Sequence, residues 1–312
     1  MLAATKQIEK QVFLTLFIIL GCNTKNYAQS DSVRIMQHLT TITKTEGYRY
    51  IRNTPLLNQT AEYIFSVFSQ YADTVYYQPF QYLDETYMNV VCRLGSANND
   101  KPLVVVGAHY DAVYYTEGAD DNASGVVGLL ELVRILSQEK LNFPIEIVAY
   151  TLEEVWPMIG SMTHAVALYK TKTPVYGMVG FEMIGYFDDR ANSQSYPVKA
   201  MKLIYGSRGN FIMLARKAKA GAFVESFSAG FTKMTTIDTK IFKASSKKMI
   251  KIISTSDHWQ YWNLGYDALM ITNTAHYRNP NYHKWTDKME TLDIQKMMQV
   301  IDATALAIIN LK

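Results

Sequence analysis

Cysteine is scarce in this sequence: the 312 residues contain only Cys22 and Cys92. So few thiols exclude a small fold that depends on a framework of disulfides. If Cys22 is removed or lipidated, Cys92 has no partner within the chain. Its neighbours at 88–94 have the pattern of a strand, so we expect Cys92 to pack there as a small hydrophobic residue.

An excess of charge of one sign is missing too. The formal net charge is +3, from 31 Lys and Arg against 28 Asp and Glu. That charge is too small to argue for nucleic acid, and basic, aromatic-rich patches are absent, so we expect no nucleic-acid partner. Low-complexity tracts, internal repeats and linkers rich in Pro, Gly or Ser are also absent, which predicts a single domain over 29–312.

The N-terminal apolar run, residues 12–20, is too short for a stable membrane span. Two lysines precede it, and this order is typical of a bacterial export signal. Two endings fit the sequence: lipidation at Cys22, as in a lipoprotein, or cleavage after Ala28. We therefore expect residues 1–28 to be an export signal and the protein to be periplasmic, attached to the outer membrane or secreted. The alternative is a buried N-terminal helix.

Short apolar strands alternate with amphipathic helices along most of the chain. Continuous apolar runs of this kind are typical of strands that are covered on both faces. The alternation predicts an α/β fold with a largely parallel sheet and helices on both sides. The strand-like runs lie at 103–107, 145–151, 175–181 and 268–272, paired strands at 74–94, and the helical patterns at 31–75, 124–138 and 293–310. A less regular insert is expected at about 206–255.

Polar side chains follow three of these strand-like runs. His109 comes just after the first run, Glu153 and Glu154 follow the second, and the third is followed by Glu182. In open α/β sheets, ligands bind beyond the carboxyl ends of the strands. We therefore expect these four groups to converge on one edge of the sheet.

Two further residues complete a set that could hold two zinc ions. Asp121 lies in a glycine-flanked turn at 118–125, and His283 lies near the C-terminus. Zinc binds imidazole nitrogen and carboxylate oxygen, and one carboxylate can bridge two ions, the role that we assign to Asp121. One ion would then take His109 and Glu182, and the other Glu154 and His283.

Glu153 is not needed as a ligand, but it lies next to the ligand Glu154, a position that suits a proton carrier. It could take a proton from a zinc-activated water and hand it to a leaving amine. Asp111 could accept the other ring N–H of His109 and fix its tautomer. Further candidates for the surrounding shell are Asp257, His258 and Asp287, and candidates to donate a hydrogen bond to an oxyanion are Tyr110, Tyr277 and Tyr282.

Five short motifs, taken together, match a known family. They are His109-Tyr-Asp111, the turn at 118–125, Glu153-Glu154, Ser256-Asp-His258 and Tyr282-His283. In combination they resemble the zinc-dependent exopeptidases of metallopeptidase family 28, which include bacterial leucyl aminopeptidases, glutamate carboxypeptidases and glutaminyl cyclases. The resemblance covers about residues 85–310. It implies a three-layer α/β/α sandwich on a mixed, mostly parallel sheet, two zinc ions, Glu153 as general base and Glu154 as a ligand.

Glu182 departs from the pattern of this family. Many of the aminopeptidases have aspartate at the matching position, and glutamate is one methylene longer. Either the backbone lies further from the metal or the coordination changes, but we still expect Glu182 to be a ligand.

Together these features predict an exported zinc metallopeptidase, above all an aminopeptidase that acts on the N-terminus of peptides. The alternatives are a glutaminyl cyclase with one zinc, a carboxypeptidase, and a non-catalytic relative that binds peptides. A further signal is the window 233–251, which holds six lysines and a single acid, Asp238. If this window overhangs the metals it would attract a substrate carboxylate, and otherwise it is a solvated loop.

Overall fold

The computed structural model describes residues 29–95 and 100–312. The predicted export signal, residues 1–28 with Cys22, therefore lies outside the described residues. None of the helices in the two described ranges combines the length and the hydrophobicity that a membrane crossing needs. Cys92 lies in a strand with its thiol free and buried.

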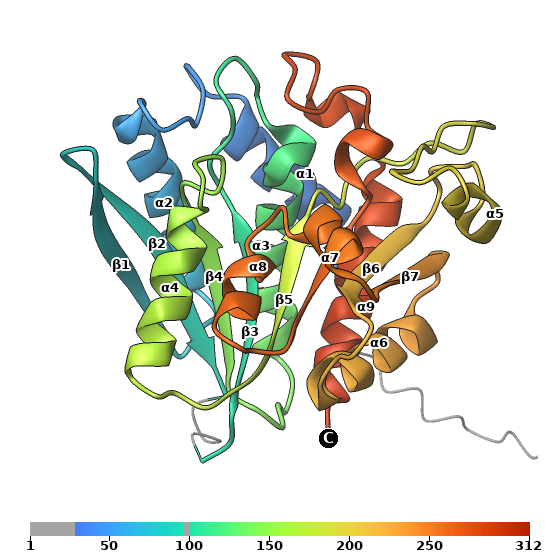
Figure 1. Cartoon of the computed structure of the whole chain (residues 1–312). Helices are drawn as coiled ribbons and strands as arrows, with labels where there is room; N and C mark the ends of the chain where they lie inside the picture. The colour runs from blue at the N-terminus through green and yellow to red at the C-terminus, as the bar shows by residue number, and fades with distance from the viewer. Residues whose placement is uncertain (1–28, 96–99) are drawn as a thin grey trace, which may run out of the picture.

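A mixed, mostly parallel sheet of eight strands forms the centre of the molecule (Figure 1). The order of its strands is β1-β2-β4-β3-β5-β8-β6-β7. The neighbours β4, β3, β5 and β8 are parallel, whereas β2 and β6 each pair antiparallel with the strand at either end of that group. The bounds are β1 (Thr74–Tyr82), β2 (Glu85–Leu94), β3 (Leu103–His109), β4 (Ile145–Tyr150), β5 (Val175–Glu182), β6 (Ile212–Lys217), β7 (Thr239–Ala244) and β8 (Ala268–Thr272).

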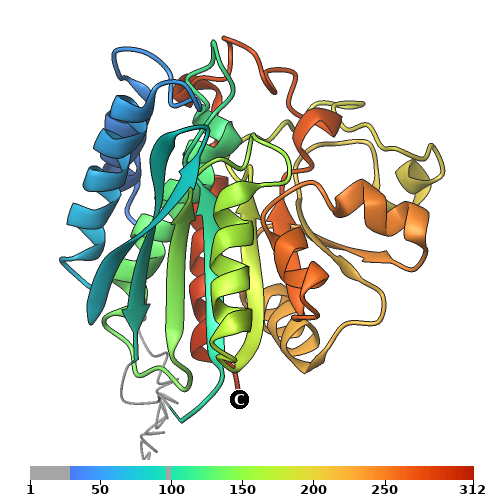
Figure 2. The same ribbon diagram turned by 60° about the vertical axis from the view of Figure 1, so that its left-hand side comes forward.

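Helices cover both faces of the sheet, which confirms the three-layer α/β/α prediction (Figures 1 and 2). One face carries α1 (Ser32–Thr43), α2 (Thr54–Phe68), α3 (Gly125–Leu136), α6 (Ala222–Met234) and α9 (Ile294–Ile309). The other carries α4 (Ile159–Lys170), α7 (Lys247–Ile253) and α8 (His258–Asn263), and α5 (Met201–Tyr205) lies at the rim.

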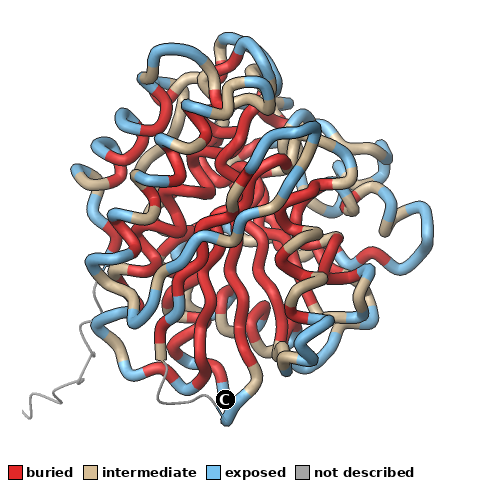
Figure 3. Tube along the Cα trace, turned by 90° about the vertical axis from the view of Figure 1, so that its left-hand side faces the viewer, coloured by how far each residue is buried: buried red, intermediate tan, exposed pale blue. Residues whose placement is uncertain are grey.

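Successive residues of the central strands enter two different cores. Val104 and Val106 of β3 pack under α3, whereas Val105 between them packs on the opposite face. This follows from the alternation of side chains along a strand. Both faces of these strands are buried (Figure 3), which is why the sequence shows continuous apolar runs there.

The stretch 206–255 is not the irregular insert that the sequence pattern suggested. It holds β6, α6, β7 and α7 in regular succession. Two features hid this regularity: β7, at the edge of the sheet, has only 6 residues and includes two lysines, and α7 has only 7 residues. The lysine-rich window thus lies mainly on a strand and a short helix rather than in a solvated loop.

Candidate metal centre

His109, the last residue of β3, lies among three carboxylates. Its Nε2 atom is 3.5 Å from an oxygen of Asp121 (Oδ1), 3.5 Å from an oxygen of Glu182 (Oε2) and 3.9 Å from an oxygen of Glu153 (Oε2). The ring is fully buried, and its Nε2 has no hydrogen-bond partner among the described residues. A buried nitrogen that faces three acids without a hydrogen bond is suited to a metal ion.

His283 faces the other side of Asp121. Its Nε2 atom is 3.1 Å from Asp121 Oδ2 and 3.4 Å from Glu154 Oε2. The two oxygens of Asp121 therefore face different imidazoles, Oδ1 that of His109 and Oδ2 that of His283. This is the arrangement that a bridging carboxylate needs.

Two sets of three residues could each hold a metal ion, because the possible ligand atoms within each set lie within 4.8 Å of one another. The sets are His109 with Glu153 and Glu182, and His109 with Asp121 and Glu154. The sets share His109 and divide the carboxylates differently from the predicted pairing, in which Glu153 binds no metal. Of the three acids around His109 Nε2, Glu153 is the most distant. We therefore assign the carboxylates to the two metal positions from the contacts of Asp121, and leave Glu153 without a metal.

Asp111 orients both the histidine and the pair of glutamates. Its Oδ1 accepts the backbone N–H of Glu153 at 3.1 Å, and its Oδ2 accepts that of Glu154 at 3.2 Å. The Nδ1 atom of His109 is 3.1 Å from the carbonyl oxygen of Asp111 and 3.5 Å from its carboxylate. One buried carboxylate thus connects the end of β3 to the loop after β4.

Sequence reasoning missed Asp120, which ties three loops together. Its carboxylate accepts the backbone N–H groups of Gly185 and Tyr186 and the side-chain amides of Asn273 and Asn279. These bonds connect the Asp121 turn to the segments after β5 and β8. The sequence signal was the neighbouring acid: of the pair at 120–121, only the second residue was considered.

Asp287 supports the same turn from the opposite side. Its two oxygens accept the backbone N–H groups of Asp120 at 2.9 Å and of Asp121 at 3.1 Å. The segment that carries His283 therefore also holds the backbone of the aspartate that His283 faces.

Arg49 was also missed, because it belongs to no motif. Its buried guanidinium donates to the carbonyl oxygens of Tyr110, Glu117 and Gly118. These acceptors lie at both ends of the loop that joins His109 to Asp121. An arginine far upstream in the sequence therefore fixes the separation between His109 and Asp121.

The backbone has a left-handed conformation at three points of the centre. Leu152, just before Glu153, has φ +59°, Met183, just after Glu182, has φ +53°, and His283 itself has φ +56°. Residues with a side chain rarely adopt this conformation. Such strain persists only where the surrounding structure enforces it, and it clusters at functional sites.

The pKa values reflect a crowd of buried acids. Burial raises the pKa of Glu153 well above its usual range and that of Glu154 to about 7. Burial alone would also raise the pKa of Asp121, but its contacts with His109 and His283 lower it to about 2.

The two imidazoles respond to the same acids. Burial by itself would lower the pKa of His109, but Glu153, with Asp111, Asp121 and Glu182, raises it well above its usual range. The pKa of His283 likewise rises to about 10, against the effect of burial, through Asp121 and Glu154. Negative charge is in excess here, and a cation would relieve it.

The three residues of the segment Ser256-Asp-His258 differ in how closely they are connected to the centre. Ser256 donates a hydrogen bond of 2.5 Å to Glu182. Asp257 is buried, burial raises its pKa to about 7, and neither of its oxygens has a hydrogen-bond partner among the described residues. His258 packs edge-on against Trp262, and burial lowers its pKa to about 3. His258 is thus a neutral core residue in this structure, whereas Asp257 belongs to the electrostatics of the centre.

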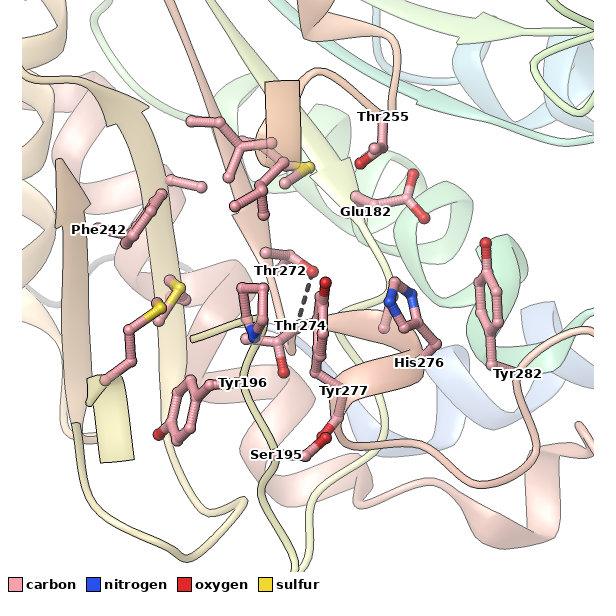
Figure 4. A pocket seen from close by; sticks show the side chains of 18 residues that line it. Glu182, Ser195, Tyr196, Phe242, Thr255, Thr272, Thr274, His276, Tyr277 and Tyr282 are labelled. Atoms are coloured by element: carbon pink, nitrogen blue, oxygen red, sulfur yellow. Dashed lines mark hydrogen bonds between the residues drawn. The ribbon is translucent and has the colours of Figure 1, made fainter. Parts of the chain in front are cut away.

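A cavity with about 780 Å³ of empty space, its open mouth included, extends from Glu182 (Figure 4). Tyr277 and Tyr282 both line it, and Tyr282 stacks on the ring of His283 with centroids 3.8 Å apart. Burial raises the pKa of the Tyr282 hydroxyl, so this group stays a proton donor.

The far part of this cavity is apolar. Among the described residues that line it, Glu182 is the one charged side chain of fixed sign, and no lysine or arginine occurs. The apolar lining includes Met201, Met213, Phe242, Ile252 and Met270. Such a space, open to a cluster of metal-ligand types, can hold an apolar group next to a reactive centre.

Comparisons with known proteins agree with this architecture. Residues 89–308 match the family model of Peptidase family M28. The chain is 38% identical over 284 residues to the Escherichia coli (strain K12) protein YfbL, covering 87% of this chain and 85% of that protein. It is 27% identical over 211 residues to the "Probable leucine aminopeptidase 1" of Trichophyton verrucosum, about half of whose length it spans (51%), with 63% of this chain covered.

Two solved structures show how widely the fold is shared. The LapA aminopeptidase of Legionella pneumophila superposes with a TM-score of 0.72 at 21% identity, covering 89% of this chain and 71% of that one. The glutaminyl cyclase of Tannerella forsythia superposes with a TM-score of 0.62 at 18% identity, covering 91% and 100%. Identities this low show a common fold and do not separate hydrolysis from cyclisation.

Proposed function

Because the chain belongs to peptidase family M28, we propose that it is a two-zinc aminopeptidase that removes apolar residues from the N-terminus of peptides. The observation that carries this proposal is the position of Asp121. Its two oxygens face His109 and His283 separately, and each imidazole has a further carboxylate beside it.

The residues fit two zinc ions by their chemistry. His109, Glu182 and one oxygen of Asp121 would hold the first ion. The other oxygen of Asp121, with Glu154 and His283, would hold the second. Nitrogen and oxygen donors of this kind suit zinc. The fit is supported by buried atoms without hydrogen-bond partners among the described residues, namely His109 Nε2 and Glu154 Oε1.

Zinc at such a centre supplies a Lewis acid that polarises a carbonyl and lowers the pKa of water to about 7. Glu153 would take the proton of the attacking water and pass it to the leaving amine. Its carboxylate is almost buried and lies near the ligands, 3.9 Å from His109 Nε2. The hydroxyl of Tyr282 would donate a hydrogen bond to the oxygen that becomes negative.

The proposed substrate class follows from the cavity next to Glu182. An apolar space without a basic residue favours leucine, methionine or phenylalanine over charged side chains. A glutamine side chain, which a cyclase must accommodate, would lose hydrogen bonds there. The apolar cavity therefore favours hydrolysis over cyclisation, although a glutaminyl cyclase shares the fold.

We also propose that the protein is exported, from the order of two lysines, the apolar run 12–20 and Cys22 in its sequence. Fractionation of cells that express the full chain, beside a Cys22→Ser variant, tests this. Membrane association that the variant loses would support lipidation, and a protein retained in the cytoplasm would contradict export.

The decisive experiment combines metal analysis with two assays. Zinc content per chain is measured, and the protein is offered Leu-p-nitroanilide and a peptide with N-terminal glutamine, with and without a chelator. We expect two zinc ions, release of leucine and loss of activity with the chelator. One zinc ion with cyclisation and no hydrolysis would overturn the proposal.

A further inference from the structure

A second pocket lies beside the metal centre, on the side of the glutamate pair. It is formed by Trp156, in the loop after β4, by Trp259 of α8, and by residues of α7 and the turn that follows it. Trp156 comes two residues after Glu154, and Trp259 two residues after Asp257. The pocket therefore adjoins the centre through two separate segments of the chain.

Two tryptophans form one wall of this pocket. Their rings stack with centroids 4.9 Å apart and planes 28° from parallel. Even so, 67% of the surface of Trp156 remains exposed. Large exposed aromatic surfaces next to a reactive centre are typical of binding sites.

Two lysines of α7, Lys247 and Lys251, stand one helical turn apart and line the same pocket. Both are exposed. Lys240, in the preceding strand, pairs with Asp238, but the side chains of Lys247 and Lys251 form no ion pair or hydrogen bond within residues 29–95 and 100–312. Two unpaired ammonium groups beside an aromatic wall provide a site for a carboxylate.

Thr255 connects the two pockets, because it lines both the apolar cavity and the pocket with the lysines. In Figure 4 it lies beside Glu182 at one end of the cavity. A peptide whose first side chain fills the apolar cavity would therefore have the pocket of Trp156 and α7 within reach, past Thr255.

We infer that the pocket of Trp156, Trp259, Lys247 and Lys251 binds a carboxylate of the substrate beyond the scissile bond. This inference rests on the proposed aminopeptidase function. The enzyme would then favour substrates whose remaining part carries a nearby negative charge. That charge comes either from the C-terminus of a short peptide or from an acidic side chain.

Two matched peptide pairs distinguish these sources. Leu-Ala is compared with Leu-Ala-amide, and Leu-Glu-Ala-amide with Leu-Gln-Ala-amide, as the ratio of kcat/KM within each pair. With two exposed ammonium groups, we expect one pair to show a preference of about three- to tenfold for the carboxylate. The preference should shrink in 0.5 M salt, because exposed charges are screened over about 3–10 Å at such ionic strengths.

The double variant K247Q/K251Q assigns the preference to this pocket. In this variant the ratio of kcat/KM within the preferred peptide pair should fall to about one. The control K248Q, on the same helix but outside the pocket, should keep the ratio of the wild type. Ratios taken within one protein cancel any general loss of activity. A wild-type ratio near one in both pairs, or a preference that survives in K247Q/K251Q, overturns the inference.

Failure of the proposed function would look different. If the zinc-loaded protein releases leucine from neither Leu-p-nitroanilide nor any peptide, the aminopeptidase proposal is wrong. The pocket can still be tested, because the Kd values of the same peptide pairs for Glu153→Gln protein do not depend on turnover. A preference of Kd for the carboxylate that K247Q/K251Q removes supports the pocket, and equal Kd values contradict it.

Discussion

The metal centre and the two pockets beside it lie at the same edge of the sheet but are held in different ways. Three of the predicted ligands, His109, Glu154 and Glu182, lie at or just after the ends of central strands, and the other two lie in turns. Buried residues such as Asp111 and Asp120 accept several hydrogen bonds around them. The inner lining of the pockets includes Glu182 and Met270 of central strands, but their outer lining comes from α5, β7 and α7. There Leu203 is 91% exposed, and the side chains of Lys247 and Lys251 are unpaired among the described residues. We therefore expect the chemistry to depend on the hydrogen-bonded centre, and selectivity on the peripheral pockets.

This comparison predicts two kinds of effect. Changes at the centre should alter turnover and metal binding for every substrate. Changes at the rim should alter the choice among substrates and leave the metal in place.

The largest effect is expected for Glu153→Gln. Glutamine keeps the shape of the side chain but cannot carry a proton, so kcat should fall by about 10²–10⁴-fold. Zinc content should stay at the wild-type value, since Glu153 is assigned no metal. Steady-state kinetics and metal analysis of the same preparation measure both, with the exposed Glu85→Gln as a matched control. Full activity in E153Q would remove Glu153 from the mechanism.

The next largest effect is expected for Asp111→Asn. The amide can accept only one of the two N–H groups that Glu153 and Glu154 donate, and it loses the charge near His109. Groups that orient a metal ligand typically contribute 10–100-fold in metal affinity, and we expect a loss of about that size. Competition with a zinc indicator measures it. If the zinc affinity is unchanged while kcat falls, Asp111 orients Glu153 alone and does not support the metal ligands.

The strands that are buried on both faces could be predicted from the sequence. The central strands appear as continuous apolar runs because both of their faces are covered, and β8 was placed at the residues it occupies. At the edge of the sheet this signal fails. In β7, the lysines Lys240 and Lys243 interrupt the apolar residues, and so short a segment at a charged edge does not identify a strand.

The candidate site divides in the same way. Three predicted ligands and Glu153 follow strands, so local sequence sufficed to bring them together. Asp121 and His283 lie in turns, where no strand end predicted their position, and the role of all five ligands stays a prediction. Asp120 and Arg49 were missed because their partners are distant in the chain: Asn273, which donates to Asp120, is 153 residues away. Such contacts exist only once the fold has formed.

A smaller effect is expected for Met201→Glu, at the outer part of the apolar cavity. Met201 lies on α5, is partly exposed and lines the cavity, so the change should not disturb the core. Replacing an apolar contact by a carboxylate should lower kcat/KM for Leu-p-nitroanilide by about tenfold relative to that for the arginine anilide. Leu203→Glu on the same helix, outside the cavity, is the control. An unchanged ratio would place the first side chain elsewhere.

The smallest effect concerns the pH dependence of stability, and it tests the metal centre without a measurement of catalysis. Burial raises the pKa of Glu154 and of Asp257 to about 7, and that of Asp287 to about 8. Unfolded, such groups titrate at about 4. Between about pH 4 and pH 8 the metal-free folded state therefore binds more protons than the unfolded chain, and the free energy of unfolding falls as pH rises.

Zinc would neutralise the repulsion among these acids, so the loaded protein should lose less stability over the same range. The Tm difference between zinc-loaded and metal-free protein, read by differential scanning fluorimetry, should widen by a few degrees from pH 5 to pH 8. Met201→Glu should reproduce this widening, since it leaves the centre intact, whereas Asp111→Asn should reduce it because zinc binds more weakly. If both variants behave alike, the centre and the rim do not respond separately, and the division between them is wrong.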